Sequence, residues 1–209
     1  MKLYDCKNAP NGRRVRIFMA EKGISLSTIE IDILAGENLQ PTYLAKNIRG
    51  LIPLLEMDDG RCIDETVAIC RFLEEQYPSH PLMGNDAYDK ATIESRQRHM
   101  EFDGLLPLAD IVRNSAPGFE HRALAGRSDV TAIEPLVTRG IASFSRFLEQ
   151  LDASLSDDKF IAGERFSIAD ITALCVVDFA KIVNISIPDQ HHNILRWHQA
   201  VSARPSALA

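Results

Sequence analysis

The chain has 209 residues, of which 45% are hydrophobic and 25% are charged, a composition that fits a globular protein with a sizeable core. Its formal net charge of −6 argues against a nucleic-acid partner, because phosphate backbones attract basic surfaces. No apolar run approaches the roughly 20 residues that cross a membrane. The first residues contain no apolar stretch of the signal-peptide type, so we expect a cytoplasmic protein.

The four cysteines lie far apart and form no C-x-x-C pair. This spacing predicts free thiols in a reducing compartment rather than a disulfide framework. His191, His192 and His198 near the end of the chain have no cysteine or carboxylate cluster beside them, so we expect no metal site.

The first 78 residues alternate strand and helix patterns, in the predicted order β-α-β-α-β-β-α. Isoleucines alternate with polar residues in the second strand, which indicates one buried face. Pro78 ends the last helix because proline cannot continue its hydrogen bonding. The predicted elements are a strand at 2–6, a helix at 12–22, a strand at 27–33, a loop with a short helix at 35–47, a hairpin at 52–65 and a helix at 66–77.

Residues 79–87 are rich in proline, glycine and polar side chains and are predicted to be a linker, after which the pattern is helical through 88–209. The segment 166–183 is nearly all apolar after its polar start, which predicts a buried central helix. Ser167 and Asp170 have the spacing of a capping box at the start of that helix. A further amphipathic stripe comprises Ile133, Leu136, Val137, Ile141, Phe144, Phe147, Leu148, Leu151 and Leu155.

Four stretches in this order resemble the cytosolic glutathione S-transferases along the whole chain: APNGRRVRIFMAEKGI, GLIPLLEMDDG, DETVAICRFLEEQY and SIADI. The resemblance implies an α/β thioredoxin-like N-terminal domain over 1–78 and an all-α helical C-terminal domain over 88–209. It also implies glutathione as co-substrate, a small hydrophobic electrophile as second substrate and a homodimer. The fold alone hosts several functions.

The resemblance assigns the ends of glutathione to particular residues. Pro53 stands where the family has a cis proline, so the backbone of Ile52 would pair with the cysteinyl part of glutathione like an added strand. Glu65 would face the γ-glutamyl ammonium, and Thr66 at the start of a helix would bind its carboxylate. Helix capping by Thr66 is compatible with this role. Gln40 lies near the expected glycyl carboxylate, although a solvated loop glutamine fits equally well.

The helical domain would supply the remaining contacts. In several classes an acidic residue on the long helix of the second domain, here in the stretch RHMEFDGLLP, reaches across the dimer to glutathione. This suggests Asp103, with Glu101 as a competitor. For both residues the alternative is a solvated charge on the helix surface. The electrophile pocket would lie between the domains. Phe102, Leu106, Asp110 and Arg113 are spaced by four, four and three and would line it, with Arg113 facing an anionic substrate; a core role for Leu106 is the alternative.

The turn Ala9-Pro10-Asn11-Gly12 lies where glutaredoxins have C-P-x-C and where the transferases have an activating tyrosine, serine or cysteine. Ala9 has no side-chain donor, so the thiolate of glutathione needs another source of stabilisation. Asn11 is our candidate catalytic residue, because its amide can donate at the start of a helix. The turn resembles that of the Nu-class bacterial transferases, where a threonine and an asparagine bind near the sulfur, and departs from it at Ala9.

Two other residues of this region are alternatives. Cys6 precedes the turn, although small buried cysteines are common in cores. Asn8 can act by shaping the turn. Three arginines follow the turn and would either attract anionic glutathione or serve as a solvated face or as a salt bridge to the other domain. They are Arg13, Arg14 and Arg16.

Two functional hypotheses follow. The first is an enzyme that transfers glutathione to an electrophile, or that reduces disulfides or peroxides with glutathione as the only thiol. The second is a non-enzymatic protein of the same fold that binds ligands or other proteins. Ala9 favours the second hypothesis, and the glutathione-binding pattern at Ile52, Glu65 and Thr66 favours the first.

Overall fold

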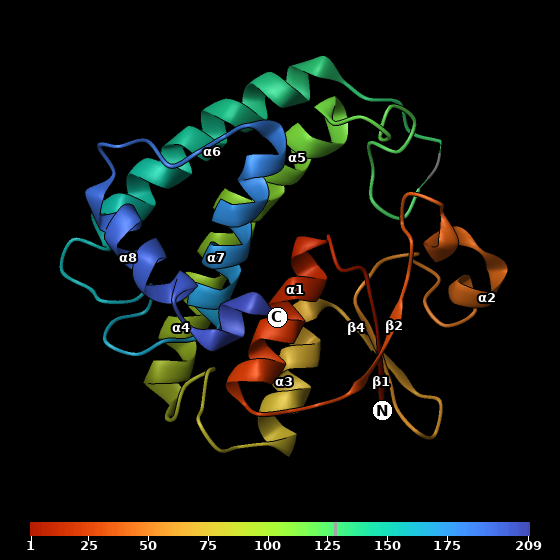
Figure 1. Ribbon diagram of the computed structural model, residues 1–209, viewed down its shortest axis with the longest axis horizontal. Helices are drawn as coiled ribbons and strands as arrows, with labels where there is room; N and C mark the ends of the chain where they lie inside the picture. The colour runs from red at the N-terminus through yellow and green to blue at the C-terminus, as the bar shows by residue number, and fades with distance from the viewer. Residues whose placement is uncertain (128) are drawn as a thin grey trace.

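The computed structural model describes residues 1–127 and 129–209. Its N-terminal part contains a four-stranded sheet in the order β2-β1-β3-β4 (Figure 1). β1 pairs in parallel with β2 and antiparallel with β3, which pairs antiparallel with β4. This mixed topology is the expected thioredoxin-like arrangement. The strands are β1 (Lys2–Asp5), β2 (Ser27–Glu30), β3 (Leu54–Glu56) and β4 (Cys62–Asp64).

Helices cover both faces of this sheet. Leu3 and Leu55 are fully buried in the core that includes α1 (Pro10–Glu21) and α3 (Thr66–Gln76). Neighbouring side chains on a strand point to opposite faces, so Tyr4 and Leu54 form a second, smaller cluster with Tyr43 of α2 (Pro41–Leu44). The short helix η1 (Glu37–Leu39) precedes α2. α1 therefore begins just beyond the C-terminal end of β1, an inner strand of a sheet that is packed on both faces.

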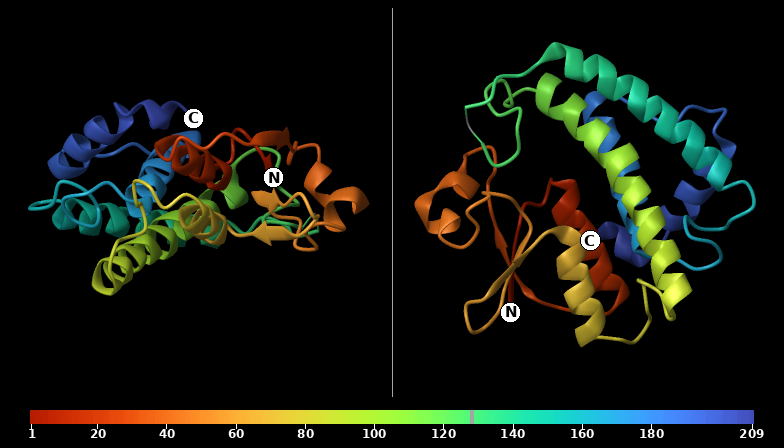
Figure 2. Two further views of the ribbon diagram at one scale, coloured as in Figure 1. Left: turned by 90° about the horizontal axis from the view of Figure 1, so that it is seen from below. Right: turned by 180° about the vertical axis from the view of Figure 1, so that it is seen from behind.

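The second part of the chain is helical and lies beside the first (Figures 1 and 2). α7 is central, and it packs against α1, α4 and α8. Within the described ranges, no helix is long and apolar enough to cross a bilayer. The elements are α4 (Ala87–His99), a π-helical segment η2 (Met100–Leu105), α5 (Leu106–Ser115), α6 (Glu134–Ser154), α7 (Ile168–Phe179), η3 (Ala180–Val183), α8 (His192–Ser202) and η4 (Pro205–Leu208).

The predicted capping box at the start of α7 is confirmed. The Ser167 hydroxyl accepts from the amide of Ala169, and the carboxylate of Asp170 accepts from the Ser167 amide at 2.9 Å. The same carboxylate also accepts from Trp197 Nε1 at 2.9 Å and from the amide of Ile161. One buried side chain therefore joins the start of α7 to α8 and to the loop before α7.

The helical pattern predicted for the second part holds where α4, η2 and α5 follow one another without a break, but this long helix is not regular throughout. Pro107 lacks the amide that would bond one turn back, and the wider π-helical turn at Met100–Leu105 directly precedes it. The apolar stripe of α6 is also only half buried. Phe147 and Leu151 are in the core, whereas Ile133 and Ile141 are about half exposed.

The reason for this difference along α6 is the position of α8. Asn193, in the first turn of α8, bonds to Asp152 at the C-terminal end of α6, so α8 covers only that end. Between the two parts of the molecule, α3 ends at Gln76 and α4 begins at Ala87. The irregular segment between them lies where the linker was predicted. The domain limits 1–78 and 88–209 stay a prediction.

Candidate functional site

The turn between β1 and α1 is closely packed against the end of the strand. A Cβ added at Gly12 would lie 1.4 Å from Oδ1 of Asp5, which is fully buried, so only glycine fits at this position. The amide of Ala9 donates to the carbonyl of Cys6 at 2.9 Å and closes the turn. Pro10 then opens α1, which has no side-chain cap and no acidic residue in its first turn. In the described part of the chain, no side-chain acceptor therefore competes for its first amides.

The start of α3 lies beside this turn. α3 also begins without a side-chain cap and without an acidic residue in its first turn. The hydroxyl of Thr66, the first residue of α3, donates to the carbonyl of Asn11 at 3.3 Å. Two helix N-termini, each with a partial positive charge, thus adjoin at one place. Such a place favours the binding of an anion.

Glu65, the residue before α3, has a strained backbone, with a φ of 67° in the left-handed region. Such a conformation costs a non-glycine residue on the order of 1–3 kcal/mol and is frequent at binding sites. The Glu65 side chain is mostly exposed and pairs with Arg49, which also contacts Asp64 at 3.3 Å. The sequence reasoning missed Arg49, because nothing in its local pattern indicates a neighbour sixteen residues away.

The peptide bond between Ile52 and Pro53 is cis, as the resemblance predicted. Ile52 is half-buried and packs beside the small cluster that includes Tyr4 and Tyr43. Ile52 lies just before β3, and within the described part of the chain its backbone N–H and C=O have no hydrogen-bond partner. Backbone groups of this kind normally find a partner, and a bound peptide backbone would provide one.

The arginines that follow the turn are engaged inside the protein. Arg13 bonds to Asp178 Oδ2 at 2.8 Å and to the carbonyl of Ala207, both in the helical domain. Arg14 bonds to the helical domain as well, through Thr172 and Glu101. Of the alternatives considered for this cluster, the salt bridge to the other domain is therefore what the structure shows for these two residues.

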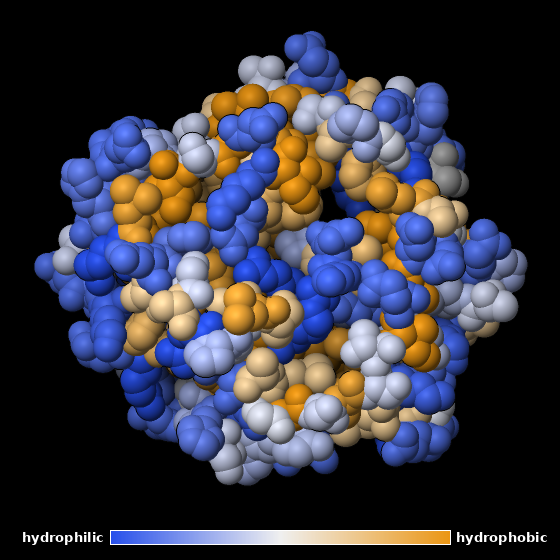
Figure 3. Space-filling model, viewed as in Figure 1, coloured by the Kyte–Doolittle hydropathy of each residue, from blue (hydrophilic) through white to orange (hydrophobic). Residues whose placement is uncertain are grey.

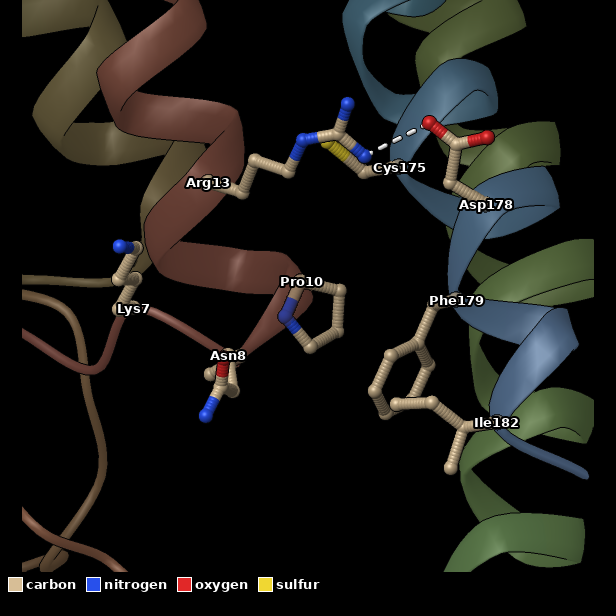
Figure 4. A pocket seen from close by; sticks show the side chains of 9 residues that line it. Lys7, Asn8, Pro10, Arg13, Cys175, Asp178, Phe179 and Ile182 are labelled. Carbon is tan, nitrogen blue, oxygen red and sulfur yellow. Dashed lines mark hydrogen bonds and ion pairs between the residues drawn. The ribbon is translucent and has the colours of Figure 1, made fainter. Parts of the chain in front are cut away.

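Arg16 behaves differently, because it stays within the first domain and pairs with the buried Asp5. Cys6 is buried beside it, and burial raises the pKa of the Cys6 thiol. A raised pKa disfavours the thiolate, so a core role fits Cys6 better than a nucleophilic one. Asn8 is exposed at the turn, and it borders the pocket described next (Figure 4).

A pocket of about 160 Å³ lies between the turn and the C-terminal end of α7. Figure 3 shows the surface hollowed near the start of α1, between the two parts of the molecule. Pro10 faces Phe179 and Ile182 across the pocket, and the ion pair of Arg13 with Asp178 closes one end (Figure 4). The lining comprises Lys7, Asn8, Ala9, Pro10, Arg13, Cys175, Asp178, Phe179 and Ile182.

Asp178 is the acidic side chain among the residues that line this pocket. Burial raises the pKa of Asp178, but hydrogen bonds from His198, Arg13 and Lys181 outweigh burial and hold the pKa below its usual range. The carboxylate is therefore ionised at neutral pH and fully engaged with cations. The rest of the lining near the turn is mainly apolar, with Pro10 on one side and Phe179 on the other.

The four residues predicted to line the electrophile pocket are not among the lining residues of the pocket beside the turn. Phe102 and Leu106 are 56% and 55% exposed, which also excludes a core role for Leu106. Asp110 pairs with Arg139 of α6, and Arg113 donates to the carbonyl of Arg122 at 3.0 Å. The role of these four residues in an electrophile site stays a prediction.

The other predicted contacts remain on the surface. Gln40 is exposed before α2, and Asp103 is exposed on η2. Glu101, the competitor of Asp103, is tied to Arg14 and Arg98, which leaves Asp103 as the acidic side chain available at this position. Within residues 1–127 and 129–209, no three histidine, cysteine, aspartate or glutamate side chains come together as a metal site would require.

Comparisons with known proteins agree with this architecture. Residues 3–81 match the family model of the glutathione S-transferase N-terminal domain, and residues 131–205 match that of the C-terminal domain. Glutathione S-transferase 2 of Saccharomyces cerevisiae is 29% identical over 99% of this chain and 87% of its own length. A crystal structure of the Saccharomyces cerevisiae protein Gtt2 superposes on this chain with a TM-score of 0.91, covering 100% of this chain and 99% of that one.

A second solved structure has higher identity. The Gtt2-class glutathione S-transferase of Vibrio parahaemolyticus is 33% identical, covers 99% of this chain and 94% of its own, and has a TM-score of 0.83. The similarity therefore extends over both domains and over the connection between them. With two family models matched in sequence order and full-length relatives of the same fold, the chain belongs to the cytosolic glutathione S-transferase family.

Proposed function

We propose that the protein conjugates glutathione to a small electrophile, with Asn11 stabilising the thiolate. Relatives that match nearly the whole chain are named glutathione S-transferases, which supports transferase activity for this protein. The assignment of Asn11 rests on the contact of Thr66 with Asn11, which joins the start of α3 to the start of α1. Carboxylate and thiolate of one glutathione molecule would then bind at two adjoining helix N-termini.

The remaining groups arrange the tripeptide around this contact. The free backbone of Ile52 would pair with the cysteinyl residue, and Glu65 would hold the γ-glutamyl ammonium. Asn11 and the first amides of α1 would donate to the sulfur and lower its pKa, which makes the thiolate available at neutral pH. Gln40 at the glycyl end and Asp103 across a homodimer remain proposed contacts.

The electrophile would enter the pocket beside the turn. Its volume of about 160 Å³ is below the roughly 300 Å³ of sites for drug-sized ligands, so the second substrate is small. Pro10, Phe179 and Ile182 provide an apolar wall. The sulfur attacks the electrophilic carbon, a C–S bond forms, and the leaving group departs with its electron pair. Holding the two reactants close together would accelerate the reaction.

Calorimetric titration with glutathione tests the binding site. We expect the wild type to bind at micromolar to low-millimolar concentration and Glu65→Ala to lose that binding. Glu75→Ala is the matched control, because Glu75 lies at the far end of the same helix and is exposed. If the wild type does not bind glutathione, the protein is a scaffold of this fold and the proposal is wrong.

Activity assays then test the reaction and the role of Asn11. Chlorodinitrobenzene reports conjugation, and a mixed disulfide of glutathione reports disulfide reduction. We expect conjugation to fall about tenfold or more in Asn11→Ala, since a hydrogen bond to a charged group contributes about 1.5–3 kcal/mol. Cys6→Ala, which removes the buried thiol, is expected to keep the activity. Disulfide reduction without conjugation would instead support the reductase alternative.

A further inference from the structure

Arg14 connects three elements at the turn through a single buried side chain. Its guanidinium is 2% exposed. Nε donates to Thr172 Oγ1 of α7 at 3.0 Å, Nη1 donates to Asn11 Oδ1 at 3.0 Å, and Nη2 pairs with Glu101 of η2. Three separate nitrogens in the rigid planar fork of arginine thus reach three acceptors, whereas lysine has all its donors on one nitrogen.

This contact determines which way the amide of Asn11 points. A guanidinium carries only donors, so the atom of Asn11 that faces Arg14 must be the oxygen. The NH₂ group of Asn11 is therefore directed away from Arg14, and in the described residues it has no hydrogen-bond partner. The backbone of Asn11 is held as well, because its carbonyl accepts from Thr66 at 3.3 Å. Both ends of the residue are fixed with a donor left over.

Stability by itself does not explain a buried arginine here. Removing a charge from water is costly, and replacing buried ion pairs by apolar residues of similar volume is often neutral or stabilising. A link between α1 and α7 would need no charge, since the two helices already pack against each other in the core. The specific result of this network is the orientation of one amide at the turn.

We propose that Arg14 is a positioning residue, which holds the NH₂ group of Asn11 toward the sulfur of glutathione. The inference rests on the proposed function, in which Asn11 stabilises the thiolate. Without Arg14 the amide can rotate, and its oxygen would then face the thiolate and repel it. Thr172 and Glu101 act one step further away, because they hold the guanidinium in place.

The test is a pH titration of the thiol of bound glutathione, followed by the ultraviolet absorbance of the thiolate. The variants are Asn11→Ala, Arg14→Lys and the double variant. Lysine keeps the positive charge and loses the fork. We expect each single variant to raise the pKa of the bound thiol and to lower kcat about tenfold, with little change in the Kd of glutathione. We expect the double variant to match Asn11→Ala, because Arg14 acts through that residue.

Arg16→Lys is the matched control. Arg16 lies on the same helix and pairs with Asp5, away from Asn11, so its replacement should leave the pKa of the bound thiol unchanged. Thr172→Val tests the network with the arginine retained, and we expect a smaller shift in the same direction. If Arg14→Lys does not fold, Thr172→Val tests the positioning role of Arg14 in its place.

The outcomes separate the two proposals. If Asn11→Ala raises the pKa of the bound thiol and neither Arg14→Lys nor Thr172→Val does, the positioning role is wrong while the proposed function stands. If Arg14→Lys raises it equally with and without Asn11, the arginine acts through its own field and positioning is again overturned. If Asn11→Ala has no effect, the catalytic assignment itself fails, and the inference with it.

Discussion

Two arginine–glutamate pairs lie beside the two ends of the proposed glutathione site, and they differ in their surroundings. Arg14 and Glu101 are 2% and 15% exposed, next to the turn where the sulfur would bind. Arg49 and Glu65 are 52% and 59% exposed, at the end where the γ-glutamyl ammonium would bind. The same two chemical groups therefore form one pair in the core and one pair in water.

The difference matters for what each pair can do. A buried pair cannot separate without leaving an uncompensated charge, so it holds its neighbours in one geometry. An exposed pair is screened by water and salt and contributes little, so one partner is easily exchanged. Reaction chemistry at the sulfur benefits from a fixed donor, whereas in the proposed binding mode the ammonium of glutathione would displace Arg49 from Glu65. Each pair suits its place in the site.

The largest effect expected from this comparison is on stability. Glu101→Gln leaves the buried Arg14 without its full countercharge, and we expect the free energy of unfolding to fall by about 3 kcal/mol. Glu65→Gln is the matched change in the exposed pair and should alter it by no more than about 0.5 kcal/mol. Urea denaturation measures both. Equal losses in the two variants would show that burial does not distinguish the pairs.

Asp178 is an intermediate case, with a side chain that is 21% exposed and three cationic or hydrogen-bonding partners. We expect Asp178→Asn to lower the free energy of unfolding by about 1–2 kcal/mol at pH 7. The pKa of Asp178 is lowered in the fold, so its contribution is present above the unfolded value of 3.8 and is lost as the pH falls through the folded value.

Thermal unfolding of wild type and Asp178→Asn between pH 7 and pH 3 measures this dependence. The difference in melting temperature should stay constant down to about pH 4 and should narrow only below that. A difference that stays the same down to pH 3 would show that the charge of the Asp178 carboxylate does not contribute to stability.

The smallest effect concerns Arg49. Arg49→Met frees Glu65 for the ammonium of glutathione, and we expect the Kd of glutathione to decrease by up to about fivefold, since an exposed pair contributes roughly 0.2–1 kcal/mol. Arg61→Met is the control, because Arg61 is exposed in the hairpin turn and pairs only locally with Asp59. Weaker binding in Arg49→Met would show that Arg49 is itself a ligand of glutathione.

Much of the fold follows from local patterns in the chain. The capping box of Ser167 and Asp170 depends on a spacing of three residues, and the structure contains it. The alternation of the strands and the end of α3 before Pro78 are equally local. The cis peptide bond before Pro53 was expected from the resemblance of the surrounding motif. The positions assigned to glutathione lie where these elements begin.

The pocket residues were predicted from a helical spacing, and none of the four lines the pocket beside the turn. Phe102 and Leu106, four residues apart, share a face in an α-helix and in a π-helical turn alike, and both side chains are about half exposed. Phe179 and Ile182, which face the turn in the structure, come from a segment that reads simply as core helix. No local signal separates a pocket wall from a core position there.

By itself, the sequence determined the order of the elements, the two-part architecture and the absence of a side-chain donor at Ala9, because these depend on residue type and short spacing. Only the tertiary structure decided where the arginines after the turn go. Arg13 and Arg14 are adjacent in the chain, yet they bind Asp178 and Glu101, which lie on different elements of the other domain. Such pairing depends on how the domains pack, and that depends on contacts between residues far apart in the chain.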